Sequence, residues 1–255
     1  MDASYIYRAR LRFIQCRPKP NYSSSCPNSI PIDPYLTRDD PIPNFGYNMR
    51  VQESLILYQY QGFWYPRVFV QGIVNCQKQY EAGENDIFLV TAPKSGTTWF
   101  SSILYALMNR EAHPPQDTHH PLLNKAPGDL VPLIELLDPS KYDLVCNSSG
   151  SSTRIFASHI PLASLPKSIT DNATSSNCKV VYVCRDIKDI FVSLFHFLNK
   201  GKYLRSPISF EHTFDLYCKG YLGPGPVWDQ ILGYWKESLE NPQKVLFMKY
   251  EDMKN

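Results

Sequence analysis

Four short apolar runs, each separated from the next by a segment long enough for a helix, constrain the fold of this chain most strongly. They are IFLV (87–90), RIFAS (154–158), KVVYV (179–183) and KVLFM (244–248). Continuous apolar runs with helical segments between them are typical of parallel strands that helices cover on both faces. We therefore predict an α/β fold, a three-layer sandwich around a central parallel sheet.

A candidate site follows from the residues that come after these runs. In open parallel sheets, ligands bind beyond the carboxyl ends of the strands. Lys94, His159, Arg185 and Tyr250 each follow one of the four runs. Because the carboxyl ends of parallel strands lie at one edge, we expect these side chains to converge on one site.

The first run leads into a loop that can bind an anion, in the segment FLVTAPKSGTTWF (88–100). Gly96 lets the backbone approach a ligand closely, Thr97 and Thr98 supply hydroxyls, and apolar residues at helical spacing follow. Free N–H groups at a helix start bind phosphate-like groups. In the usual nucleotide-triphosphatase loop the lysine follows the last glycine, whereas Lys94 precedes Gly96 here, so ATP chemistry is not the first expectation.

A second anion site is predicted in the segment YVCRDIKDIFVSLFHFLNK (182–200). Its apolar residues, which include Ile187 and Phe197, recur at helical spacing and form one face, so Ser193 faces away from the core. Arg185 precedes this helix, and its planar guanidinium recognises phosphate well. Two anion sites at neighbouring strand ends suit a ligand with two separated phosphate-like groups.

Composition excludes several classes of function. A chain of 255 residues suits one sizeable domain, and a net charge of +2 is too balanced for a general nucleic-acid binder. No run of about 18 or more apolar residues occurs, so we expect no membrane span. Clustered metal ligands are also lacking, and we expect no metal. We therefore expect neither nucleic acid nor membrane as a partner.

Two further expectations come from cysteine usage and from the N-terminal composition. Seven scattered cysteines without a CxxC pair favour reduced thiols and a cytoplasmic location. Residues 1–45 are rich in Pro, Ser and Asn, which predicts a poorly ordered N-terminal extension before a domain over residues 46–255.

From about Tyr58 to Lys254 the chain resembles the soluble, cytosolic sulfotransferases, most closely those of the plant type. The segments that carry the resemblance are, in order, LYQYQGFWYP, PKSGTTW, SHIPLASLP, YVCRDIKDIFVSLFHF, GPVWDQILGYWKESLE and YEDMK. The family's P-loop-like domain uses 3′-phosphoadenosine 5′-phosphosulfate. The 5′-phosphosulfate and the 3′-phosphate of this donor would occupy the two predicted anion sites. The resemblance implies sulfuryl transfer to a hydroxyl of a small aromatic or apolar acceptor, such as a flavonoid, phenolic, steroid or hormone-like molecule.

The resemblance also implies which residues bind the donor. The residues implied to hold the 5′-phosphosulfate are Lys94, Ser95, Gly96, Thr97 and Thr98. Those implied to bind the rest of the nucleotide are Trp99 and Tyr250 at the adenine, and Arg185 and Ser193 at the 3′-phosphate.

The implied catalytic residues are His159 and Lys94. His159, in the segment ASHIP, matches the family's catalytic histidine and would take the acceptor's proton. Lys94 would offset the charge that develops on the leaving oxygen. The aromatic stretch 57–65 is either core or a wall of the acceptor pocket, and the loop near His119 and His120 is a second candidate for that wall.

The sequence departs from the family pattern in three places, and the first is the proline-rich stretch 1–45, which has no clear counterpart in the family. Asp186 stands where the family usually has asparagine, which puts an extra carboxylate beside the implied phosphate site. The family also continues well beyond YEDMKN into helices and a basic, glycine-containing segment, so the resemblance implies a domain that is incomplete at its C-terminus.

Two alternative functions therefore stay open at this point. The chain could be a truncated, non-catalytic binding protein that retains part of the nucleotide or acceptor site. It could also be a P-loop small-molecule kinase, which would need ATP and magnesium. Acceptor identity and oligomeric state do not follow from the sequence.

Overall fold

The computed structural model describes residues 48–52, 55–145, 153–171, 177–200, 204 and 206–254. The N-terminal extension that we predicted over residues 1–45 lies outside the described residues, so the predicted domain boundary stays a prediction. In the part of the chain that is described, the helices are too short or too polar to cross a membrane.

The predicted parallel sheet is confirmed. Its strands are β4 (Ile87–Thr91), β5 (Ile155–Ser158), β6 (Lys179–Cys184) and β7 (Val245–Lys249). They pair in the order β5-β4-β6-β7, and every pairing is parallel. Their carboxyl ends therefore lie along one edge, and the observed strand bounds differ from the apolar runs by one residue at most.

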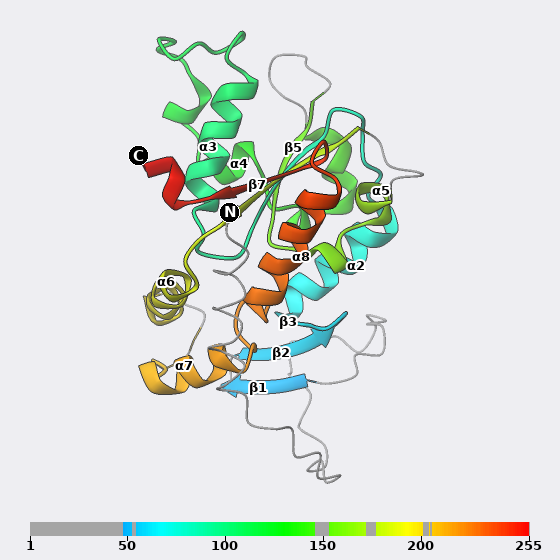
Figure 1. Ribbon diagram of the computed structural model, residues 1–255. Helices are drawn as coiled ribbons and strands as arrows, with labels where there is room; N and C mark the ends of the chain where they lie inside the picture. The colour runs from blue at the N-terminus through cyan, green and yellow to red at the C-terminus, as the bar shows by residue number, and fades with distance from the viewer. Residues whose placement is uncertain are drawn as a thin grey trace.

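Helices cover both faces of this sheet (Figure 1). The α-helices are α2 (Arg67–Gln79), α3 (Thr97–Met108), α4 (Pro127–Leu130), α5 (Lys167–Thr170), α6 (Ile187–Lys200), α7 (Phe210–Cys218) and α8 (Val227–Glu240). The short 3-10 helices are η1 (Pro121–Leu123), η2 (Ile134–Leu136), η3 (Pro139–Leu144), η4 (Leu162–Ser164) and η5 (Glu251–Lys254).

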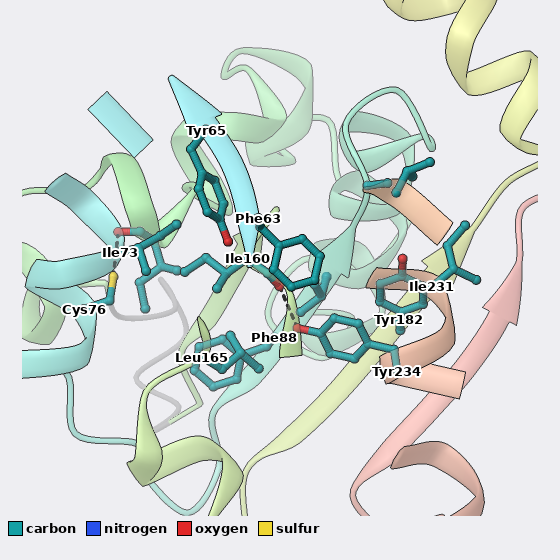
Figure 2. Packing of buried hydrophobic residues seen from close by; sticks show 14 of the residues in the cluster. Phe63, Tyr65, Ile73, Cys76, Phe88, Ile160, Leu165, Tyr182, Ile231 and Tyr234 are labelled. Carbon is teal, nitrogen blue, oxygen red and sulfur yellow. Dashed lines mark hydrogen bonds between the residues drawn. The ribbon is translucent and has the colours of Figure 1, made fainter. Parts of the chain in front are cut away.

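Alternating residues of β4 show the three layers. Leu89 packs with Phe100 of α3 in a small cluster on one face. Phe88 belongs to the main core on the other face, together with Ile73 of α2 and Tyr234 of α8 (Figure 2). Because successive strand residues point to opposite faces, helices lie on both sides of the sheet, as predicted.

A separate antiparallel sheet contains the aromatic stretch. It consists of β1 (Asn48–Gln52), β2 (Leu55–Tyr60) and β3 (Phe63–Pro66), in that order. Leu57, Phe63 and Tyr65 are buried in the main core, so the inward-facing half of this stretch is core. Tyr60 and Trp64 stay partly exposed.

The core also fixes the segment that follows β5. The rings of Tyr182 and Tyr234 stack with their centroids 4.3 Å apart, and the Tyr234 hydroxyl donates a 2.7 Å hydrogen bond to the carbonyl of Ile160 (Figure 2). Both tyrosines are fully buried. The backbone next to His159 is therefore held by a stacked pair that reaches from β6 to α8.

Candidate functional site

The loop between β4 and α3 is held by two residues that follow other strands. Lys94 has φ 73° and Gly96 has φ 94°, so the chain turns sharply before α3 begins. Nη1 of Arg185, after β6, donates a 3.0 Å hydrogen bond to the carbonyl of Lys94. A Cβ added to Gly96 would lie 2.7 Å from Cε2 of Tyr250, after β7. Three of the four predicted strand ends therefore meet at this loop.

Two buried polar atoms of this group have no hydrogen-bond partner among the residues that the structure describes. They are Oγ of Ser95 and Nε of Arg185. Buried polar groups normally have partners, so orphaned donors beside a helix start fit a loop that binds an anion. This observation supports the fit of a phosphate-bearing ligand at the loop.

The Arg185 guanidinium also contacts an aromatic ring and a carboxylate. Its central carbon lies 4.9 Å from the ring centroid of Tyr250, and Nη2 lies 3.3 Å from Oδ2 of Asp189. Trp99 is 40% exposed, and its ring meets that of Tyr250 edge to face with the centroids 5.6 Å apart. An exposed aromatic surface therefore adjoins the arginine.

Ser193 lies in the second turn of α6, and Asp186 directly precedes that helix. Ser193 is partly exposed, away from the buried face, as its helical position predicts. Oδ1 of Asp186 accepts a 2.8 Å hydrogen bond from the N–H of Lys188, so this carboxylate satisfies an otherwise unpaired donor at the helix start. The residue that departs from the family pattern therefore has a structural partner.

Phe197 corrects the prediction of one apolar face on α6. It is 40% exposed, and Nζ of Lys94 lies 4.3 Å from its ring centroid, within the range of a cation–π contact. Burial and then the positive charge of Arg185 lower the pKa of Lys94. Helical spacing alone could not separate Phe197 from the core residues of the same helix.

His159, the fourth strand-end residue, has its ring fixed by a backbone carbonyl. Nδ1 lies 2.9 Å from the carbonyl oxygen of Thr91 at the end of β4. Because a carbonyl oxygen only accepts, Nδ1 carries the proton and Nε2 keeps a lone pair. Burial, and the nearby charge of Lys94, lower the pKa of His159 to about 4, so its imidazole is neutral near pH 7.

Thr91 is a site residue that the sequence analysis missed. Its Oγ1 lies 2.6 Å from Oγ1 of Thr97 in the anion loop and 3.3 Å from Nδ1 of His159. It therefore links the histidine to the start of α3. Its place directly after the run 87–90 was the available signal.

Glu135 is the second residue that was missed. The backbone N–H of His159 donates a 2.7 Å hydrogen bond to Oε1 of Glu135, which is 1% exposed. Burial raises the pKa of Glu135 to about 7, although hydrogen bonds from backbone groups and from Ser158 oppose this effect. The available signal was a single acid inside the apolar run 130–137.

The two histidines proposed for the acceptor wall differ in exposure. His120 is buried, and its ring meets those of Tyr105 and His113. His119 is exposed, and its N–H donates to Asp117. Across the described ranges, no group of three or more His, Cys, Asp or Glu side chains is arranged to hold a metal ion.

Comparison with known proteins identifies relatives across most of the chain. A family model described as "Sulfotransferase domain" matches residues 84–255. Cytosolic sulfotransferase 13 of Arabidopsis thaliana is 44% identical over 200 residues, which cover 78% of this chain and 58% of the relative. The chain therefore spans less than two thirds of that relative.

Solved structures agree with this comparison. An Arabidopsis thaliana sulphotransferase structure matches with a TM-score of 0.67 and 41% identity, over 82% of this chain and 70% of the other. Mouse sulfotransferase SULT7A1, complexed with PAP (adenosine 3′,5′-bisphosphate), matches with a TM-score of 0.58 and 28% identity, over 78% of this chain and 62% of the other.

Proposed function

Because the chain belongs to the sulfotransferase domain family, we propose that it transfers a sulfuryl group from 3′-phosphoadenosine 5′-phosphosulfate to a hydroxyl of a small acceptor. One observation carries this proposal. The neutral imidazole of His159 lies next to the anion-binding loop that contains Lys94, because Thr91 contacts both His159 and Thr97. A base beside an anion site is what transfer to a hydroxyl requires.

We assign the donor's 5′-phosphosulfate to the loop 94–98 and its 3′-phosphate to Arg185 and Ser193. Orphaned donors at Ser95 and Arg185 support the two assignments. The exposed ring of Trp99, next to Tyr250, supports adenine binding there, since aromatic faces stack on bases. The PAP complex of the mouse relative is consistent with this donor class.

The bound donor supplies an electrophilic sulfuryl group with a nucleotide leaving group. Nε2 of His159 accepts the hydroxyl proton of the acceptor as the new oxygen–sulfur bond forms. Lys94 offsets the negative charge that develops on the phosphate oxygen as the old sulfur–oxygen bond breaks. Thr91 keeps the imidazole in the tautomer that can take a proton, because its carbonyl binds the other nitrogen.

A small aromatic or apolar acceptor suits the surroundings of His159. The ring of Phe69 lies 6.4 Å from that of His159, and the exposed ring of Phe197 lies beside Lys94. Flat apolar molecules pack well against such rings. We further propose a cytoplasmic location, as in the name of the Arabidopsis relative, and a transfer domain over residues 46–255 that works without a metal.

Incubation of the folded 255-residue chain with the donor and a panel of phenols, flavonols and steroids tests this function. We expect a sulfated product by mass spectrometry, and we expect it to disappear with His159→Ala. Nucleotide binding without any product would instead favour the binding-protein alternative. Magnesium-dependent consumption of ATP would favour the kinase, which the position of Lys94 ahead of Gly96 argues against.

A further inference from the structure

Glu135 is a buried acid without a cationic partner in the described part of the chain. The other buried acid there, Asp86, forms a 2.6 Å ion pair with Arg154. Oε2 of Glu135 has no hydrogen-bond partner among the described residues, and the groups that bind the carboxyl, which are backbone N–H groups and the Ser158 hydroxyl, are all neutral. Burying a carboxyl group without a charged partner costs several kcal/mol, so packing alone does not explain an acid at this position.

The fold brings this acid to the peptide of His159 by two contacts. Leu133 pairs with Ala157 in a short parallel bridge, so the segment before η2 runs beside β5. On the other side, α2 packs closely onto η2, since a Cβ added to Gly72 would lie 1.6 Å from the carbonyl oxygen of Glu135. Glu135 is therefore held between α2 and the end of β5.

The carboxyl group supplies an acceptor that an apolar side chain of the same volume lacks. Oε1 accepts the N–H of His159 at 2.7 Å. The carbonyl of His159 accepts a 3.0 Å hydrogen bond from Nε2 of Gln230 in α8. With the ring bound to the carbonyl of Thr91, the backbone and the imidazole are fixed from three different elements.

We propose that Glu135 is a positioning residue for His159, and that its hydrogen bond to the His159 peptide holds the imidazole where it can accept the acceptor's proton. This inference rests on the proposed function, because it assumes that His159 is the base. Misplacing a reacting group by about 1 Å can lower a rate roughly 100-fold, so a single positioning bond has a measurable effect.

Three variants of the 255-residue chain test the proposal. Glu135→Leu removes the acceptor and keeps an apolar side chain, Glu135→Gln keeps an acceptor oxygen, and Tyr142→Phe is the control. The Tyr142 hydroxyl is buried 3.2 Å from Sγ of Cys76, in the same core. For each folded variant, kcat, the Kd for adenosine 3′,5′-bisphosphate and the NMR signal of the His159 imidazole are measured, with His159→Asn to assign the signal.

We expect Glu135→Leu to lower kcat by about 10- to 100-fold and to shift the imidazole signal, with the nucleotide Kd unchanged. Glu135→Gln and Tyr142→Phe should stay within about threefold of the wild-type kcat and keep its signal. A Glu135→Leu variant no worse than Tyr142→Phe, with an unshifted signal, would overturn the proposal. If Glu135→Leu does not fold, a folded Glu135→Gln variant as inactive as His159→Ala overturns it, and one near the wild-type rate supports it.

The imidazole signal separates this proposal from the proposed function, because it needs no turnover. If the wild-type chain transfers no sulfuryl group, the proposed function is contradicted. A shifted imidazole signal in Glu135→Leu would still support the role of Glu135 in positioning His159. If the wild-type chain is active and Glu135→Leu leaves the His159 imidazole signal unchanged, only the positioning role is contradicted.

Discussion

The ring of Tyr250 lies against Gly96 so closely that a Cβ on Gly96 would come within 2.7 Å of Cε2. Tyr250 follows β7 and Gly96 follows β4, and β6 lies between these two strands in the sheet. The contact therefore ties the anion loop to a strand two positions away. It requires glycine for two reasons, which are the close approach and the φ of 94°.

Gly96→Ala should therefore weaken nucleotide binding and lower stability by about 1–3 kcal/mol, because a left-handed residue gains strain and the Tyr250 ring must move. Gly62→Ala is the matched control, since Gly62 has φ 85° but nothing within 4 Å of an added Cβ. The two variants are compared by thermal unfolding and by titration with adenosine 3′,5′-bisphosphate. Equal losses of affinity would show that the Tyr250 contact is irrelevant.

The imidazole of His159 should titrate near pH 4 in the folded chain, because burial and Lys94 disfavour its charged form. NMR of the imidazole signal, assigned with His159→Asn, measures this pKa. Lys94→Met should raise it, since the substitution removes a neighbouring positive charge. A His159 pKa close to the ordinary value, unchanged by Lys94→Met, would contradict the described environment.

The stability of the chain should depend on Glu135 in a defined pH window. Its folded pKa of about 7 lies above the ordinary value of 4.5, so the folded state binds more protons between these values. Stability from this group is thus fully present below pH 4.5 and is lost as the pH rises through 7.

Glu135→Gln should therefore gain stability relative to the wild type between pH 5 and pH 8, by on the order of 3 kcal/mol at most. Chemical denaturation at the two pH values measures the difference. Tyr142→Phe removes a phenol that does not titrate in this range. Its free energy of unfolding should therefore differ from that of the wild type by the same amount at both pH values. A constant difference for Glu135→Gln as well would refute the raised pKa.

The sheet and the four strand-end residues could be predicted because they depend on local patterns. Continuous apolar runs mark β4 to β7, and the residues that follow each strand within a short loop are fixed by chain order alone. Gly96 and Arg185 were recognisable because loop conformation and phosphate recognition each need a particular residue type.

The support around His159 could not be predicted in the same way. Thr91 orients the imidazole through its backbone carbonyl, which any residue type provides, and its hydroxyl meets Thr97 and His159 only through the tertiary fold. Glu135 reaches the histidine only because β5 pairs with the segment at Leu133, a tertiary contact between parts of the chain 24 residues apart. Phe197 follows the apolar period of α6, yet it lies exposed beside Lys94.

In the function that we propose, four strand ends form one site for 3′-phosphoadenosine 5′-phosphosulfate. Calorimetric titration of the folded chain with adenosine 3′,5′-bisphosphate tests it most directly, with Arg185→Ala as the site variant and Lys219→Ala as the control. Lys219 lies at the surface and pairs with Asp215 within its own helix region.

We expect the wild-type chain to bind the nucleotide saturably. Arg185→Ala should weaken this binding by about 10- to 100-fold, which corresponds to the loss of one charge-assisted hydrogen bond of roughly 1.5–3 kcal/mol. Lys219→Ala should leave the affinity unchanged. No binding by the folded wild-type chain, or equal binding by wild type and Arg185→Ala, would contradict the claim.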